Sequence, residues 1–358
     1  MASVLRKNKL GHLPVEYDVA HDLCFVIHDL LVELLKSGSE GDFFRTSLEF
    51  DDDADRLALE NSSDIFGWLS ENRRVDQRAQ VLVTRVFPAV LSDTLHCIYE
   101  ALESSRKGKL NITYMLIRKP IQENLFLLES VVANRLDFAD NLSTAPLKLR
   151  ATKAGSMEVH AKRVEGVLEM VRETHRLNAA YIAQLRYEKC EDGFDGICNQ
   201  AMHLFTEHPA IRTAPLNVNF IFSDMPEKLT QWAYLYSRLP YLLFYIYRIV
   251  EHIGAGFAPT SGDYIDDIER RISALIVLWW PSVSERYRCD HLEKFYAETE
   301  GWLRAHCDEA RCRNPTGRDL YRMARCGALP GEAAINVRER AKMYESIASL
   351  NRAAVNDV

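Results

Sequence analysis

The chain has 358 residues, of which 47% are hydrophobic and 27% are charged, an ordinary balance for a soluble globular protein. Its formal net charge of −7 disfavours indiscriminate binding to nucleic acid, although a local basic patch can still bind phosphate. Eight cysteines are scattered without a regular framework, which favours free thiols, and no continuous apolar leader follows the first basic residues. We therefore expect a cytoplasmic protein.

Helical periodicity covers almost the whole sequence, so we expect an all-α fold, a multi-helix bundle with at most one short extended segment. The expected helices are 18–36, 75–105, 110–135, 157–187, 195–206, 228–253, 264–278, 282–307, 316–326 and 330–351. The extended segment is 217–222, where apolar and other residues alternate. Residues 137–156 contain serine, proline and glycine and are expected to form a linker.

Three of these helices carry proline in mid-run, at Pro88, Pro120 and Pro240. An interior proline removes a backbone hydrogen bond and costs about 3 kcal/mol, so we expect kinked central helices held by tertiary packing. Helices 110–135 and 228–253 are apolar around most of their circumference and should form the core. The apolar runs 239–250 and 272–283 fall short of the roughly 20 residues that a membrane span needs, so no membrane association is expected.

The predicted organisation has three helical regions, 1–142, 157–256 and 263–358, with the central region packed on the first. A single continuous domain is the alternative.

Metal and cofactor sites are not expected. The sequence lacks a glycine-rich phosphate loop, a His-Glu-x-x-His helix and a Cys-x-x-Cys pair. An acidic cluster at 51–55 could bind a divalent cation, but its place before a helix favours capping and solvation. Near the C-terminal end, the Cys and His residues lack the spacing of zinc ligands, so buried thiols are favoured. These residues are Cys289, His291, His306, Cys307, Cys312 and Cys326.

The first group that could carry chemistry lies on helix 110–135. Arg118 is at the edge of its apolar face, close to Gln122 and Glu129, and Glu123 projects to the opposite side. Because the helix is apolar on two sides, Arg118 and Glu123 should be half-buried and should need partners. Either they form structural ion pairs, which is the favoured interpretation, or they line a polar seam that faces a ligand.

The second group is the segment 201–209, which contains His203 and His208. His203 points away from the apolar face of its helix. His208 lies at the predicted C-terminus, where unpaired carbonyls favour an imidazolium, so a structural cap is the favoured interpretation. Two histidines five residues apart are poorly placed to share one metal ion.

The sequence Ile117-Arg118-Lys119-Pro120-Ile121-Gln122-Glu123 resembles the Arg-x-x-x-x-Glu helix of bacterial all-helical proteins allied to the HEPN superfamily. The helix that ends at His208-Pro209 is similar to a short helix found downstream in those proteins, and the resemblance covers residues 75–254. It implies a helical bundle, a bacterial origin and a role in RNA cleavage or phage defence. In that scheme Arg118 stabilises phosphate charge, His203 or His208 exchanges protons, and Glu123 orients the histidine.

The chain departs from the HEPN ribonucleases in one respect. Those enzymes carry Arg-x4-6-His on one helix, and here only Arg6/His12 and Arg286/His291 have that spacing. Roughly three such pairs arise by chance from this composition, so the pattern carries no information.

A group of arginines near the C-terminal end is the predicted nucleic-acid site. Arg311, Arg313 and Arg318 flank a Pro/Gly turn that precedes a helix, a combination that suits phosphate. A solvated helix face is the alternative interpretation.

Two functions are therefore predicted, and the first is favoured: a helical interaction protein that binds a protein partner, a second copy or RNA. The second is a metal-independent HEPN-like ribonuclease or toxin-type effector.

Overall fold

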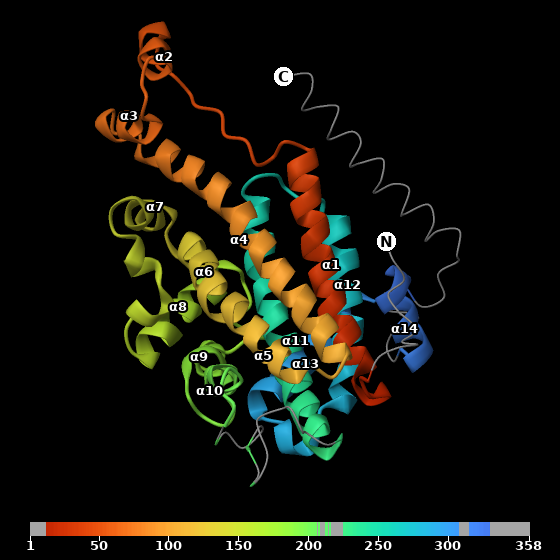
Figure 1. Ribbon diagram of the computed structural model, residues 1–358. Helices are drawn as coiled ribbons and strands as arrows, with labels where there is room; N and C mark the ends of the chain where they lie inside the picture. The colour runs from red at the N-terminus through yellow and green to blue at the C-terminus, as the bar shows by residue number, and fades with distance from the viewer. Residues whose placement is uncertain are drawn as a thin grey trace.

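The computed structural model describes residues 12–205, 207, 212, 213, 215, 225–307 and 315–329. These residues form helices and connecting turns with no strand among them, which confirms the predicted all-α multi-helix bundle (Figure 1). The predicted extended segment 217–222 and the predicted helix 330–351 lie outside the described residues.

The described helices follow the chain in this order: α1 (Asp18–Glu40), α2 (Asp53–Glu60), α3 (Ile65–Glu71), α4 (Val75–Arg106), α5 (Leu110–Lys119), α6 (Leu125–Ala133), α7 (Arg135–Thr144), α8 (Met157–Met170), α9 (Ala179–Tyr187), α10 (Phe194–Gln200), α11 (Met225–Ala255), α12 (Gly262–Trp279), α13 (Asp290–His306) and α14 (Gly317–Cys326). Between them lie short 3₁₀ segments η1 (Val15–Tyr17), η3 (Pro146–Leu149), η4 (Ala151–Lys153), η5 (Trp280–Ser282) and η6 (Glu285–Tyr287), and a π-helical turn η2 (Pro120–Asn124).

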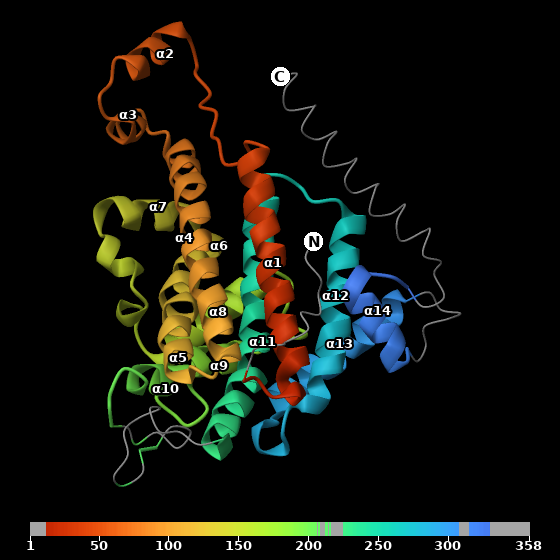
Figure 2. The same cartoon turned by 45° about the vertical axis from the view of Figure 1, so that its right-hand side comes forward.

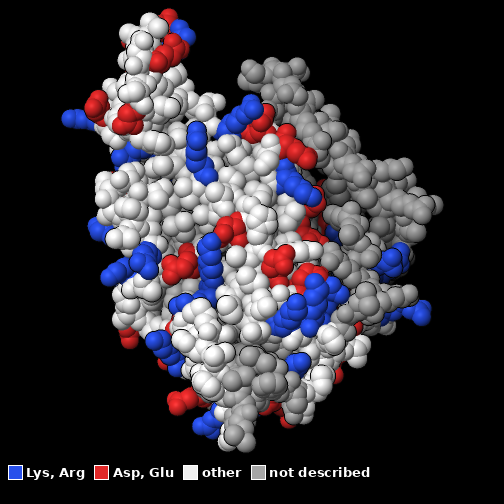
Figure 3. All heavy atoms as spheres, in the orientation of Figure 1, with Lys and Arg blue, Asp and Glu red and all other residues white. Residues whose placement is uncertain are grey.

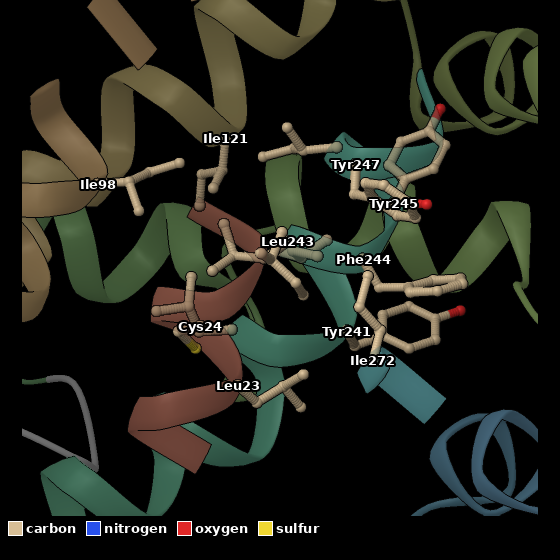
Figure 4. Packing of buried hydrophobic residues seen from close by; sticks show 14 of the residues in the cluster. Leu23, Cys24, Ile98, Ile121, Tyr241, Leu243, Phe244, Tyr245, Tyr247 and Ile272 are labelled. Atoms are coloured by element: carbon tan, nitrogen blue, oxygen red, sulfur yellow. The ribbon is translucent and has the colours of Figure 1, made fainter. Parts of the chain in front are cut away.

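The core surrounds α11, whose residues between Gln231 and Ile253 are almost all buried. This helix contacts α1 on one side and α6 on the other, and α1 in turn packs against α4 and α12. Leucine, isoleucine and ring side chains from these helices interdigitate, as Figure 4 shows around Leu243 and Phe244. One hydrophobic cluster includes residues of all three predicted regions, such as Leu23, Val164 and Leu320.

The three interior prolines affect their helices differently. Pro88 and Pro240 lie inside the continuous helices α4 and α11. Pro120 begins the π-helical turn that separates α5 from α6, so the predicted helix 110–135 changes its hydrogen-bond register in the middle. Proline lacks the N–H that the α-helical register needs, and a wider turn accommodates its ring.

Several predicted boundaries were wrong, and the predicted helix 195–206, for example, ends at Gln200. The predicted linker 137–156 is half helical, because Asn134 adopts an extended conformation and its side chain accepts hydrogen bonds from the N–H groups of Leu136 and Asp137, which begins α7. The predicted helix 157–187 is divided into α8 and α9. Arg172 turns the chain in the left-handed region at φ 59°, and Asn178 caps α9.

The predicted helix 316–326 has the expected ends. The Thr316 side chain and Asp319 form a reciprocal capping box at its start, and Gly327 adopts the left-handed conformation at its end, with φ 65°. By contrast, the predicted helix 282–307 begins only at Asp290, after the short segments η5 and η6.

Candidate functional site

The π-helical turn η2 presents backbone carbonyls to a buried arginine. Arg186 on α9 is fully buried, and its Nε donates a hydrogen bond to the Ile121 carbonyl at 2.6 Å. Its Nη2 lies 3.5 Å from the Gln122 carbonyl. Both carbonyls belong to the π-helical turn, where the hydrogen-bond register departs from that of the α-helix, and a side chain of another helix binds them there.

Glu129 on α6 neutralises this arginine. Its carboxylate is also fully buried and forms an ion pair with Arg186. The same carboxylate accepts a hydrogen bond from the Tyr245 hydroxyl at 2.9 Å and lies 3.0 Å from Nη2 of Arg163 on α8. Burial disfavours the charged guanidinium, but Glu129 together with Tyr187 and Tyr245 more than offsets this effect, so the pKa of Arg186 is raised above its ordinary value.

Arg118 joins the same network through Gln122. Its Nε donates to the Gln122 side-chain oxygen at 3.2 Å. The Gln122 amide nitrogen donates to the Arg186 carbonyl at 2.7 Å and to Asp195 on α10 at 2.8 Å. The contact between Arg118 and Gln122 agrees with their predicted neighbouring positions on helix 110–135. Through the Gln122 side chain, this part of the chain binds α9 and α10.

The other predicted catalytic residues lie in different surroundings. Glu123 is half-buried and forms no ion pair with another described residue. His203 is exposed in the turn that follows α10, where its backbone N–H donates to the Gln200 carbonyl at 2.9 Å. His208 lies outside the described residues. Helix α10, which precedes His203, packs against α5, which carries Arg118. The ribonuclease scheme stays a prediction.

His160 on α8 belongs to the buried hub and was not predicted from the sequence. Its ring stacks on Tyr187 with centroids 3.9 Å apart, and Arg163 Nη2 lies 3.2 Å from its Nδ1. Burial, with the positive charges of Arg163 and Arg186 behind it, lowers the pKa of His160 to about 4. The ring is therefore neutral at physiological pH, and its Nδ1 can accept the hydrogen bond from Arg163.

A second buried ion cluster joins α11 and α12 to the turn after α8. Two nitrogens of Arg176 donate to both carboxylate oxygens of Glu173, at 2.7 and 2.8 Å, and a third binds Glu269. Arg248 lies 2.6 Å from Glu173 and 2.9 Å from Glu251. The opposite charges of these groups pair with one another inside the bundle, so we assign the cluster a structural role.

Helices α2 and α3 form a lobe that projects from one end of the bundle (Figures 1 and 2). We call residues 49–74 the lobe. Arg74 fixes its base: Nη1 donates to the Glu49 carbonyl at 2.6 Å, Nη2 lies 2.9 Å from Asp51, and the guanidinium lies over the Trp68 ring. Arg74 also pairs with Asp55 on α2. The lobe is thus a structured unit.

The lobe exposes apolar side chains that a buried helix would hide. None of the eight residues of α2 is buried, although Ala54, Leu57 and Ala58 share one face of this amphipathic helix. Leu57 is 50% exposed, and at the start of α3 Ile65 and Phe66 are 47% and 38% exposed. Arg56 occupies the opposite face of α2 and pairs there with Asp53 and Glu60.

The acidic cluster before α2 acts as a cap. The Asp52 side chain accepts a hydrogen bond from the Asp55 N–H at 2.8 Å, as the capping interpretation expected. Among the residues that the structure describes, no three His, Cys, Asp or Glu side chains gather closely enough to hold a metal ion. Cys312, one of the cysteines weighed as a zinc ligand, is outside that part of the chain.

Of the predicted nucleic-acid residues, Arg318 is exposed on the first turn of α14, whereas Arg311 and Arg313 lie outside the described residues. Within the described chain, α4 is long and apolar enough to cross a membrane, but the core helix of a soluble protein passes the same test. Helix α4 packs against α1, α5 and α7.

No protein-family model matches this chain, and neither a curated protein nor a solved structure is significantly similar to it.

Proposed function

We propose that the protein is an interaction scaffold that binds a protein partner through its lobe. The observation that carries this proposal is helix α2, an amphipathic helix with an apolar face and no buried residue. In a monomeric protein such a face is normally packed against the body, and an exposed one marks a binding surface. The membership of this scaffold in a bacterial defence system follows only from the HEPN resemblance and stays a prediction.

The charge of the lobe defines the partner. Residues 49–74 contain eight carboxylates and three arginines, and the carboxylates stand on the lobe in Figure 3. Phosphate backbones are repelled by such a surface, whereas a basic peptide is attracted. We therefore expect an amphipathic partner segment whose apolar residues cover Leu57 and whose lysines or arginines surround this contact.

A designed peptide tests this proposal. The probe is a helical peptide with leucine at i, i+3, i+4 and i+7 and lysine elsewhere, and the control peptide replaces lysine with glutamate. The protein should bind the first peptide and not the second. The double variant Leu57→Gln/Phe66→Gln removes apolar surface without changing charge and should weaken binding about ten-fold or more.

Two outcomes would contradict the proposal. One is equal affinity of the double variant and the unaltered protein, because the peptide would then bind elsewhere. The other is the absence of any binding at micromolar peptide concentrations. A matched variant on α13, Glu293→Lys/Glu298→Lys, changes exposed carboxylates far along the chain and should retain the affinity.

A further inference from the structure

The chain contains a second surface whose chemistry complements the lobe. We call residues 146–153, which comprise η3 and η4, the basic segment. It presents Leu147, which is 67% exposed, and directly after it in the chain the exposed side chains of Lys148, Arg150 and Lys153. None of these three cations forms an ion pair with another described residue.

The basic segment is held firmly against the body. Leu149 packs against the main hydrophobic cluster, and Ala151 is 3% exposed. The segment therefore alternates between anchored apolar residues and outward-facing residues, which keeps Leu147 in a fixed position at the surface. An exposed apolar side chain on the same short segment as three cations suits binding to an acidic surface with an exposed leucine.

Both surfaces lie on the same edge of the molecule. In Figures 1 and 2 the lobe occupies the upper left, and α7, the basic segment and α8 lie lower on the same side. Two further side chains on this edge, Leu136 on α7 and Val159 on α8, are 40% and 49% exposed. Lysine and arginine side chains also appear along this lower left edge in Figure 3.

We infer that a second copy of this chain is the partner, bound as a two-fold dimer in which the lobe of each protomer docks on the basic segment of the other. This inference rests on the proposed docking role of the lobe. A two-fold axis that passes through the shared edge, midway between the two surfaces, places the lobe of one protomer against the basic segment of the other. One rotation thus forms both contacts, and each pairs carboxylates and Leu57 with cations and Leu147.

Because each contact joins opposite charges at an exposed rim, the dimer should weaken as salt is added. Sedimentation of the full chain at increasing concentration should show a monomer–dimer equilibrium. The dissociation constant should rise with sodium chloride concentration. A chain that remains monomeric at about 100 μM in low salt would overturn the inference, since specific dimers of this kind associate well below that concentration.

A charge-exchange experiment identifies the two surfaces. The variant Glu60→Lys/Asp64→Lys/Glu71→Lys leaves five carboxylates and six cations on the lobe and so makes it basic as well, and Lys148→Glu/Lys153→Glu makes the basic segment acidic as well. Neither set of residues makes a contact that holds the core: among the described residues Glu60 pairs with the exposed Arg56, the side chain of Asp64 does not cap α3, and Glu71 is exposed. Circular dichroism verifies that both variants keep the helical fold.

Each variant alone should dimerise at least about ten-fold more weakly, because it apposes like charges. An equimolar mixture of the two should regain the dimer, because the basic lobe of one then meets the acidic segment of the other, and the reverse contact is complementary too. The control Glu285→Lys/Glu293→Lys/Glu298→Lys changes net charge by the same amount as the lobe variant, at exposed carboxylates elsewhere, and should dimerise normally. A mixture that fails to dimerise, or single variants that dimerise like the unaltered protein, would refute the inferred contact.

The peptide titration separates this inference from the proposed function. If the chain is monomeric while peptide binding depends on Leu57, the lobe is a docking surface for a different protein, and only the dimer is refuted. If neither dimerisation nor peptide binding depends on the lobe, both proposals fail.

Discussion

The Nε atom of Arg186 on α9 donates a hydrogen bond of 2.6 Å to the carbonyl oxygen of Ile121 in the π-helical turn. This contact joins a proline-induced change of helix register to a fully buried charge, 65 residues apart along the chain. The turn supplies the acceptor, and Glu129 supplies the countercharge. The polar hub is therefore built around the break in the helix.

The Arg186–Glu129 pair should be essential for stability. Glu129→Gln leaves the Arg186 guanidinium buried without its countercharge and should lower the free energy of unfolding by roughly 3–5 kcal/mol. Arg118→Ala, which removes one hydrogen bond at a half-buried edge, should cost no more than about 1.5 kcal/mol. Urea denaturation followed by circular dichroism measures both values. Equal, small losses in the two variants would show that the buried pair is not the structural centre of this region.

Protonation of His160 should destabilise the protein in weak acid. Its pKa in the folded protein is about 4, below the ordinary value of 6.5, so between these pH values the unfolded chain binds a proton that the folded protein does not. The stability that the folded protein gains from a neutral His160 is complete above pH 6.5 and is lost as the pH falls toward 4. We expect the free energy of unfolding to fall by about 1–2 kcal/mol over this range, because partial solvation of the ring screens part of the effect.

The variant His160→Phe provides the control for this pH dependence. Phenylalanine keeps a ring on Tyr187 but cannot titrate, so the difference in unfolding free energy between the two proteins should change between pH 7 and pH 4. Parallel profiles for the two proteins would show that His160 is not the group responsible.

The position of the core can be tested by replacing one leucine that is buried and one that is exposed. Leu125 is 1% exposed at the start of α6, and Leu125→Ala should lower the free energy of unfolding by about 2–5 kcal/mol. Leu147→Ala, at a side chain that is 67% exposed, should change it by less than about 0.5 kcal/mol at concentrations where the chain is monomeric. A loss below about 1 kcal/mol at Leu125 would mean that the core is misplaced.

RNA binding, if it occurs, should use the predicted arginines near α14. The triple variant Arg311→Ala/Arg313→Ala/Arg318→Ala should weaken RNA binding and reduce its dependence on salt, because each neutralised phosphate releases counterions. The variant Lys148→Ala/Arg150→Ala/Lys153→Ala removes the same charge from a different surface and serves as the control. Unchanged affinity and salt dependence in the first variant would leave those arginines as a solvated surface.

The sequence predicted the long helices well and their interruptions poorly. Periodicity predicts α4 and α11 because their apolar faces repeat over many turns, and Thr316 and Gly327 mark α14 because capping acts locally. The turn at Arg172 has a left-handed conformation at a residue type that rarely adopts it, so no local signal announces it.

Side-chain function was harder to predict for a different reason. Glu129 lies 57 residues from Arg186, and Glu269 lies 93 residues from Arg176, so no local pattern links either pair. The sequence placed Arg118 beside Gln122 correctly because one helix carries both. The exposed face of α2 has the same pattern as a buried amphipathic helix, so only the tertiary structure shows that none of its residues is buried by the part of the chain that is described.

The docking role of the lobe is tested most directly by hydrogen exchange with the lysine–leucine peptide present and absent. We predict slower exchange of backbone amides in residues 53–71, which contain α2 and α3, and no change in α13. The same peptide should leave exchange unaltered in Leu57→Gln/Phe66→Gln. Protection that maps to α13 or α14, or an unchanged lobe at saturating peptide, would contradict the account.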